Sequence, residues 1–339
     1  MAFVAEGHSN DSLLQEHNCV HAYYPTVFYR EIAQQLRRHG LTVHTSDVLQ
    51  SLNESPLVEV YFESQAVSQA QCPRVMIAME NPQINPLNAS ECYLQGFAKV
   101  LTWNRKLSHL PSFEYLAYVP LEPIVPDEQR CANRSKLATM VCSNKIFKTP
   151  VNGDLYAERL RIVEWFEKNS PQDFDLYGQG WHKPAQETTI LGKIRRSGRR
   201  LRNFLTSSPC YRTWRGPLHS KQDALSRAWF GFCYENSSTQ EGYVTEKLLD
   251  TLAIGAVPIY LGAPDIQNYV PTDLFIDARS FSGISDLVAF CKAMPLEHRL
   301  RMIGEGHDFI YNSEVFSLKK NVGIAANAIV SAIHSSPAR

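Results

Sequence analysis

Hydrophobic positions in the first third of the chain recur with two different periods. Val27, Phe28, Ile32, Ala33 and Leu36 are spaced like one face of a helix, which predicts a helix over 26–39 that ends at Gly40. Short apolar runs of strand length follow at 41–44, 58–62, 74–79 and 99–103. Because helices separate such strands, the pattern favours parallel pairing and a doubly wound α/β sheet.

A second unit of the same kind follows a stretch that contains Pro120, Pro123 and Pro126 and is typical of a linker. Its strands are predicted at 136–141, 173–178, 229–234 and 257–261, and its helices at 157–168, at 245–252 and over most of the chain after residue 284. We therefore expect one domain at 1–135 and another at 136–339, with a C-terminal helix that is free to pack back on the first. Two α/β units of similar size favour ligand binding in a cleft between them.

Composition and charge narrow the classes of function. Of the 339 residues 44% are apolar, which excludes a disordered chain, a collagen-like chain and a disulfide scaffold. The 34 basic and 34 acidic side chains balance, and zero net charge argues against a nucleic-acid-binding protein. No apolar run reaches the roughly 18 residues of a membrane span, and the first residues lack a signal peptide, so we expect a cytoplasmic protein. The eight cysteines form no CxxC pair, which favours reduced thiols over a metal or redox site.

The most specific chemistry lies in residues 229–264. An apolar strand leads into Glu235 and Asn236 and, after a polar loop, into a helix that Thr245 can cap. The free N–H groups of the first helical turn and the positive end of the helix dipole make an anion site, to which Lys247 adds a full charge. A nucleotide diphosphate would fit there.

Other polar side chains of this segment suit the rest of such a ligand. Glu246 can bind ribose or sugar hydroxyls, while Asn236 and Tyr243 can orient the ligand. A capping cluster on an ordinary helix is the alternative interpretation of Thr-Glu-Lys taken alone.

Three stretches of the segment, in this order, resemble a known signature. They are Glu-Asn-Ser at 235–237, Tyr-Val-Thr-Glu-Lys at 243–247 and Gly-Ala-Val-Pro-Ile-Tyr-Leu-Gly at 255–262. Together they resemble the donor-binding signature of glycosyltransferase family 10, the α1,3/α1,4-fucosyltransferases. Weaker similarity extends the resemblance over about residues 136–280, and the first unit matches much less.

The resemblance implies a GT-B fold, in which two Rossmann-like domains face each other across a cleft and the C-terminal one holds GDP-fucose. It implies an inverting fucosyltransferase that moves L-fucose from GDP-fucose to a hydroxyl of an acceptor glycan through an α1,3 or α1,4 link. Such a reaction needs a base for the acceptor hydroxyl and cations for the departing GDP.

Two cations are candidates for the diphosphate. Lys247 is the first, at the helix terminus, and Arg159 is the second, because it resembles the family's arginine on the helix after the first donor-domain strand. A guanidinium can bind phosphate through two N–H groups. A surface arginine is the alternative for Arg159, and Arg161 is its nearest competitor.

The candidate for the base is Glu80. It follows the predicted strand 74–79, and polar residues at the C-terminal end of a parallel strand are where active sites are built. Glu80 also resembles the family's proposed N-domain base. Glu63 and Glu59 are competitors, a water-facing loop glutamate is the alternative, and Glu235 is expected to be structural or to lie on the donor side.

A metal is not expected. Asp173 and Asp175 form a DxD pattern, but the pattern falls at the entrance of a predicted strand, where the family has strand residues. We therefore expect no cofactor and no obligatory metal, with lysine and arginine side chains in place of a metal cation.

A basic segment at 193–202 has six positive charges and no acidic residue. Three interpretations stay open: peripheral contact with the inner face of a membrane, which suits a lipid-linked saccharide acceptor, a solvated insertion, or a flap that assists diphosphate binding. Two rivals to fucosyl transfer also stay open. One is the same fold with another nucleotide sugar, and the other is an inactive protein that binds a sugar nucleotide or a glycan.

Overall fold

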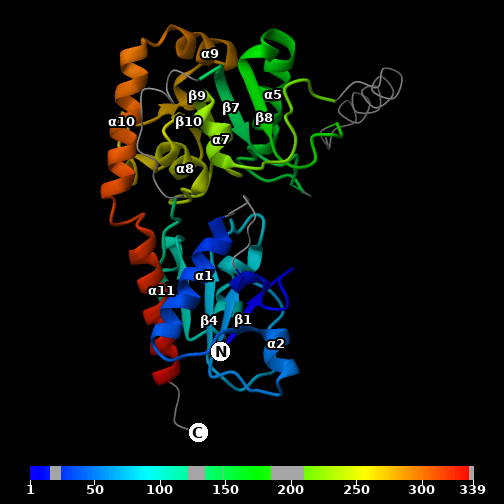
Figure 1. The fold of residues 1–339 in the computed structure, drawn as a ribbon, viewed down its shortest axis with the longest axis vertical. Helices are drawn as coiled ribbons and strands as arrows, with labels where there is room; N and C mark the ends of the chain where they lie inside the picture. Colours follow the sequence, from blue (N-terminus) through cyan, green and yellow to red (C-terminus); the bar gives the residue numbers. More distant parts are fainter. Residues whose placement is uncertain (16–23, 121–133, 148, 185–209, 336–339) are drawn as a thin grey trace. The chain divides into compact units, whose positions relative to one another are not determined.

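The structure is a computed structural model, and it describes residues 1–15, 24–120, 134–147, 149–184 and 210–335. The chain divides into two compact units (Figure 1). Unit 1 consists of residues 1–120 and 313–339, and unit 2 of residues 121–312. The basic segment 193–202, together with Pro123 and Pro126, lies outside the described residues.

Unit 1 is built on a parallel sheet with the strand order β2-β1-β3-β4-β5-β6. Its strands are β1 (Ala2–Ala5), β2 (His44–Thr45), β3 (Glu59–Phe62), β4 (Arg74–Ala78), β5 (Lys99–Thr102) and β6 (Phe113–Tyr115). Its helices are α1 (Tyr24–Arg38), α2 (Ser46–Ser51), α3 (Glu91–Leu94) and α11 (Leu318–His334).

Two helices from opposite ends of the chain pack together in unit 1. Phe28, Ile32 and Leu36 recur every four residues on the buried face of α1, as an amphipathic helix requires. Helix α11 packs against α1 and against strands β4 and β5, and alanines make up much of its buried face. Ala117 N donates a hydrogen bond to Asn321 Oδ1 at 3.1 Å, which joins α11 to the chain that follows β6.

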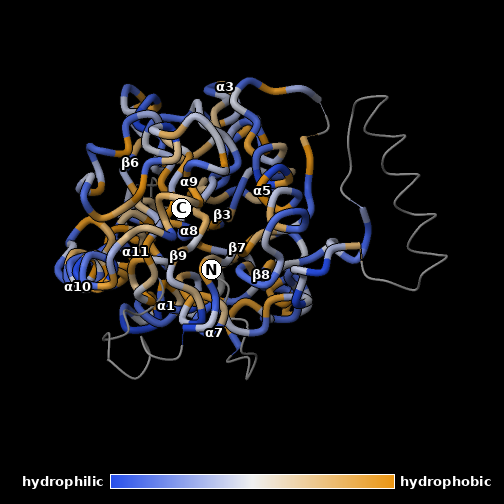
Figure 2. The backbone as a smooth tube through the Cα atoms, turned by 90° about the horizontal axis from the view of Figure 1, so that it is seen from above, coloured by the Kyte–Doolittle hydropathy of each residue, from blue (hydrophilic) through white to orange (hydrophobic). Residues whose placement is uncertain are grey.

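Unit 2 is built on a second parallel sheet with the order β11-β10-β9-β7-β8. Its strands are β7 (Lys136–Val141), β8 (Phe174–Tyr177), β9 (Ala228–Tyr234), β10 (Val257–Leu261) and β11 (Ile276–Asp277). Its helices are α5 (Tyr156–Asn169), α7 (Lys221–Ser226), α8 (Glu246–Ile254), α9 (Ile284–Ala293) and α10 (Leu296–Asn312). Figure 2 shows α10 coloured largely hydrophilic, in agreement with its charged sequence.

Both sheets contain a point where the chain connections leave in opposite directions. In unit 1 this point lies between β1 and β3, and in unit 2 it lies between β7 and β9. Open parallel sheets bind ligands outside the carboxyl ends of the strands at such a point. The strand order therefore directs attention to the residues that follow β3 in unit 1 and β9 in unit 2.

The structure corrects several boundaries predicted from the sequence. The strand expected at 41–44 is the two-residue β2 at His44–Thr45, and three strands, β1, β6 and β11, were not predicted. The first segment of unit 1 ends at residue 120 rather than at the expected 135, and the C-terminal helix α11, which was expected to be free to pack back on the first domain, belongs to unit 1. Among the described residues, no helix is long and apolar enough to span a bilayer.

Candidate functional site

The loop from β9 to α8 positions a buried carboxylate against the start of a helix. Thr245 caps α8 in extended conformation, and its Oγ1 accepts a hydrogen bond from Lys247 N at 3.3 Å, which confirms the predicted cap. Gly255 ends the helix at a φ of 88°, a left-handed conformation that suits glycine.

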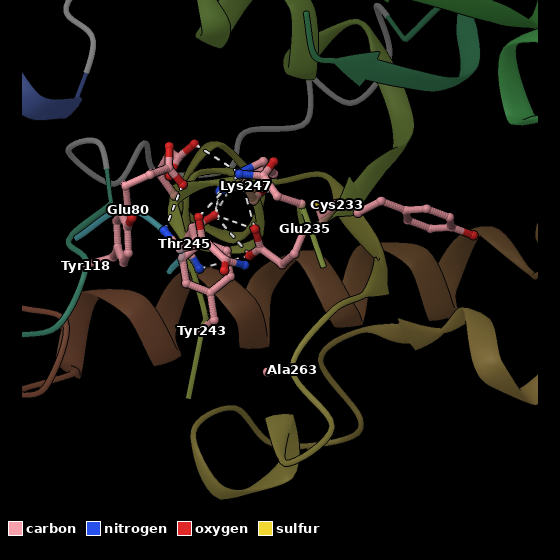
Figure 3. A network of polar contacts seen from close by, with 12 residues as sticks. Glu80, Tyr118, Cys233, Glu235, Tyr243, Thr245, Lys247 and Ala263 are labelled. Atoms are coloured by element: carbon pink, nitrogen blue, oxygen red, sulfur yellow. Dashed lines mark hydrogen bonds and ion pairs between the residues drawn. The ribbon is translucent and has the colours of Figure 1, made fainter. Parts of the chain in front are cut away.

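Glu235, Thr245 and Lys247 point toward one another and form what we call the α8 cluster (Figure 3). Glu235 is fully buried; its Oε1 accepts from Thr245 N at 2.9 Å, and its Oε2 lies 3.2 Å from Lys247 Nζ. Lys247 Nζ also donates to Thr245 Oγ1 at 3.1 Å. Burial raises the pKa of Glu235, and the charge of Lys247 opposes this shift. The ammonium is therefore held at the helix N-terminus by a buried counter-charge.

A glycine of the sequence signature makes room for this carboxylate. A Cβ placed on Gly262 would lie 2.5 Å from Cγ of Glu235, a distance that real side chains do not reach. Glu235 N in turn donates to Leu261 O at 2.8 Å. The signature glycine therefore leaves the space that the side chains of Glu235 and Tyr260 occupy.

Glu246 is ionised at neutral pH. Burial opposes ionisation, but the charges of Lys247 and Lys221 lower the pKa of Glu246 to about 2. Lys221 of α7 forms an ion pair with Asp250 and lies 3.4 Å from Glu246 O. A carboxylate in this state only accepts hydrogen bonds, which fits the predicted binding of hydroxyl groups.

Arg159 ties α5 to the end of β9. It is 4% exposed; its Nε and Nη2 donate to Tyr234 O at 3.1 and 2.6 Å, and Nη2 also donates to Asn236 Oδ1 at 2.9 Å. Asn236 Nδ2 in turn donates to Tyr243 Oη at 3.4 Å. Within the part of the chain that the structure describes, these bonds leave the two N–H groups of Nη1 for a further acceptor.

A small pocket adjoins the α8 cluster at the switch point of unit 2. It is lined by Thr139 and Val141 of β7, Phe232 of β9, Lys221 and Leu225 of α7, and Lys247 and Thr251 of α8. The six residues predicted in unit 2 form two groups: Arg159, Asn236 and Tyr243 are joined by hydrogen bonds, and Lys247 contacts Thr245 and Glu246. Of these residues Lys247 lines the pocket, together with Lys221, which is paired with Asp250.

The DxD residues are engaged in ion pairs. Asp175 lies in β8, is buried, and binds Arg215 at 2.6 Å and Lys136 at 3.5 Å. Asp173 binds Lys292 at 2.7 Å. Across the described ranges of the chain, no group of three or more His, Cys, Asp or Glu side chains is arranged to hold a metal ion.

Glu80 belongs to unit 1 and follows the end of β4. Its Oε1 accepts a hydrogen bond from Asn81 N at 2.9 Å, and its own N–H donates to both carboxylate oxygens of Glu63 at 3.1 Å. Glu59, the other competitor for the role of base, lies at the opposite end of β3, where it accepts from Tyr61 Oη and Ser68 Oγ. Of the two competitors, only Glu63 is at the carboxyl end of the strands.

Glu63 has an unusual environment. Burial raises the pKa of Glu63 to about 7; hydrogen bonds from Asn88, Glu80 and Met79 oppose the shift, and the charge of Glu80 adds to it. Its φ is 66°, in the left-handed region that non-glycine residues rarely adopt. Sequence reasoning named Glu63 only as a competitor, because its burial depends on how β3 and β4 pair.

The raised pKa of Glu63 predicts a pH-dependent stability. The pKa in the fold, about 7, exceeds the ordinary value of 4.5, so the contribution is fully present below about pH 4.5 and is lost as the pH rises through 7. Relative to the Glu63→Gln variant, the wild type should lose up to about 3 kcal/mol of stability between these limits. Urea unfolding of both proteins from pH 5 to pH 8 measures this difference. Parallel pH curves for the two proteins would contradict the assignment.

Comparisons with known proteins agree on one family for part of the chain. Residues 203–300 match the sequence model of "Glycosyltransferase family 10 (fucosyltransferase) C-term". An α-(1,4)-fucosyltransferase from Arabidopsis thaliana is 40% identical over 81 residues, which are 24% of this chain and 19% of that protein. An α-(1,3)-fucosyltransferase from Helicobacter pylori is 30% identical over 75 residues, which are 22% of this chain and 16% of that protein. The match thus spans about a fifth of the length of these curated relatives.

The fold is shared over the full chain. A crystal structure of an α1,3-fucosyltransferase with GDP superimposes with a TM-score of 0.56 and 16% identity, and the match covers 99% of this chain and 92% of that one. A sucrose-phosphate synthase from Thermosynechococcus elongatus gives a TM-score of 0.58 at 11% identity, covering 99% and 100% of the two chains. The two parallel sheets and these neighbours establish the GT-B fold.

Proposed function

We propose that this chain, whose residues 203–300 match the sequence model of the glycosyltransferase family 10 C-terminal region, is a fucosyltransferase that uses GDP-fucose. The acceptor is a hydroxyl of a glycan, either a free oligosaccharide or a lipid-linked saccharide, and the new link is α1,3 or α1,4. The observation that carries the proposal is the α8 cluster, which holds the Lys247 ammonium at a helix N-terminus inside the family domain.

The α8 cluster suits a departing diphosphate. Negative charge grows on the leaving group as the bond to the sugar breaks, and a cation that is already in place stabilises that charge without reorganisation. Lys247 Nζ is fixed by Glu235 and Thr245, and Arg159 offers Nη1 from the other side of the β9 terminus. Lysine and arginine would then do the work of a metal, and we propose transfer without an obligatory metal or cofactor.

Glu246 is a hydrogen-bond acceptor for the hydroxyl groups of the proposed GDP-fucose donor. Glu246 is ionised and lies beside Lys247, with its Oε1 3.5 Å from Lys247 Nζ. A carboxylate there binds the hydroxyls of ribose or of fucose while the ammonium binds phosphate. Asn236 accepts a hydrogen bond from Arg159 and donates one to Tyr243, so Asn236 keeps the guanidinium in place for the donor.

Glu80 is proposed as the general base. It takes the proton of the acceptor hydroxyl, whose oxygen bonds to the anomeric carbon while the bond from that carbon to GDP breaks. Attack from the face opposite the leaving group inverts the configuration. The proton ends on the Glu80 carboxyl, and the electron pair of the broken bond leaves with GDP.

Nucleotide selectivity tests the proposal directly. Calorimetry of the full chain in buffer with EDTA is expected to show binding of GDP, because Lys247 supplies a cation for the diphosphate without a metal. A preference for GDP over UDP and CDP is expected because the proposed donor is GDP-fucose. The same sample is then assayed for transfer from GDP-fucose to a panel of acceptor saccharides. Preference for UDP would favour another nucleotide sugar, a strict metal requirement would redirect attention to Asp173 and Asp175, and GDP binding without any transfer would favour a binding protein.

A further inference from the structure

Each backbone N–H and C=O group of Met79 and Glu80 forms a hydrogen bond with a side chain. Met79 N and Glu80 N donate to the carboxylate of Glu63 at 3.0 and 3.1 Å. Met79 O accepts from Trp103 Nε1 at 2.7 Å and from Tyr118 Oη at 2.5 Å. Two aromatic side chains therefore donate hydrogen bonds to the carbonyl of the peptide group that joins Met79 to Glu80, and one carboxylate accepts from its N–H.

The other side of Glu80 is tied to the same carboxylate through Asn88. Asn88 Nδ2 donates to Glu63 Oε2 at 2.5 Å and to Glu80 O at 3.0 Å, while Asn88 Oδ1 accepts from Ser64 N at 3.0 Å. Ser64 Oγ in turn donates to Asn85 Oδ1 at 2.6 Å. Asn88 and Asn85 belong to the loop after Glu80, so this loop is fastened to the residues that end β3.

The backbone of Glu63 is adapted to this task. Its left-handed φ of 66° ends β3 and turns the chain, and its N–H donates to Ile77 O at 3.0 Å. Such a conformation is disfavoured for glutamate and persists only where the surroundings require it. The residue stands at the carboxyl end of the strands, at the switch point of the unit 1 sheet.

We propose that Glu63 is a positioning residue that sets Glu80 for proton transfer by binding the backbone N–H groups of Met79 and Glu80. The inference rests on the proposed function, since it deepens the role of Glu80 as base. Glu63 acts through hydrogen bonds to the backbone, so it need not touch the substrate. We call the hydrogen bonds from the N–H groups of Met79 and Glu80 to Glu63 the Glu63 clamp. A misplacement of about 1 Å in a reacting group can cost about 10²-fold in rate, so loss of the clamp is expected to lower the rate measurably.

Glu63→Gln is the informative substitution. Glutamine keeps the shape, but its amide nitrogen cannot accept a hydrogen bond, so it faces the N–H groups of Glu80 and Asn88 with a donor. We expect kcat to fall by about 10- to 100-fold and the KM for GDP-fucose to stay unchanged. Glu59→Gln is the matched control, because Glu59 is a buried carboxylate at the start of β3, whereas Glu63 follows the end of that strand. It should leave kcat unchanged even where it lowers thermal stability.

The pH profile separates positioning from mere support of the fold. Protonation of Glu63 turns one acceptor oxygen into a donor, so kcat of the wild type should fall as the pH falls through about 7, and Glu63→Gln should lack this limb. The titratable groups that face Glu63 are Glu80, after β4, and Tyr29, on α1. Tyr29 does not titrate in this range, because burial and the charge of Glu63 raise its pKa further above its ordinary value.

The chemical shift of a labelled backbone amide reports on the Glu63 clamp without an assay of fucosyl transfer. The chain has six methionines, so ¹⁵N-methionine labelling of the full protein gives few resonances, and Met79 is assigned by substitution. In the wild type the Met79 amide shift should titrate near pH 7 with Glu63, and in Glu63→Gln it should not.

A pH-independent Met79 amide in the wild type, or a wild-type kcat and pH profile in Glu63→Gln, would overturn the inference. A titrating amide in a protein that transfers no fucose would support the clamp and overturn the proposed function instead.

Discussion

Lys247→Ala is expected to weaken GDP binding by about 10- to 100-fold and to lower turnover by about 10²- to 10³-fold. The ammonium lies at the N-terminus of α8, and in the proposed reaction it faces phosphate charge both in the bound donor and in the departing GDP. The larger effect on turnover follows because the charge on the leaving group is greatest as the bond breaks. Calorimetry with GDP and initial rates with GDP-fucose measure the two losses.

Lys247→Ala also removes the positive charge that faces the buried carboxylate of Glu235. Glu235 is fully buried, and a buried charge that loses its partner typically costs about 3–5 kcal/mol of stability. The double variant Glu235→Gln with Lys247→Ala removes this penalty, because a neutral amide can still bond to Thr245. It should regain stability and still bind GDP weakly.

Lys292→Ala is the control in the same unit. Lys292 is half exposed and forms an ion pair with Asp173, so the change is expected to stay within about 1 kcal/mol. If Lys247→Ala bound GDP with wild-type affinity, Lys247 would not be part of the donor site.

Glu80→Gln is expected to lower kcat by about 10²- to 10⁴-fold and to leave GDP affinity unchanged. Glutamine cannot take a proton from the acceptor hydroxyl, yet its carbonyl oxygen can still accept the bond from Asn81 N. The backbone of Glu80 stays held by Glu63 and Asn88, so the fold should tolerate the change. Thermal unfolding, GDP calorimetry and transfer rates on one preparation separate these effects.

Glu91→Gln is the matched control in unit 1. Glu91 is exposed on α3, where it contacts His109, and its substitution should leave all three measurements unchanged. Near-normal transfer by Glu80→Gln would exclude Glu80 as the base and would return the role to another carboxylate.

Local sequence was sufficient for the elements that make the donor side. The predicted strand 136–141 coincides with β7, and the predicted cap Thr245 begins α8 at Glu246. A cap bonds to a group only two residues away, so its signal is contained in a few neighbouring letters. The strands β1, β6 and β11 were missed, and β6 and β11, with three and two residues, are too short to show a period. Each is held by pairing: β1 lies between β2 and β3, β6 pairs with β5, and β11 pairs with β10.

The contacts that tune the site depend on distant parts of the chain. Arg159 was predicted as a phosphate ligand, but its Nε and Nη2 are bonded to Tyr234, 75 residues away, and to Asn236. Glu63 reaches the N–H of Glu80 only because β3 and β4 pair in one register, with Phe62 beside Ile77. Residue types and spacing could therefore name the candidates, whereas their hydrogen-bond partners required the fold.

The packing of α11 against α1 has a consequence for biosynthesis. A ribosome makes α1 first and α11 only after the whole of residues 121–312. At typical elongation rates of about 5–20 residues per second, the apolar face of α1 waits roughly 15 to 60 s for its partner. Unit 2 is continuous in the chain and can fold during this interval, so the unit that is started first is finished last. Chaperones that shield nascent apolar helices would meet this protein through α1.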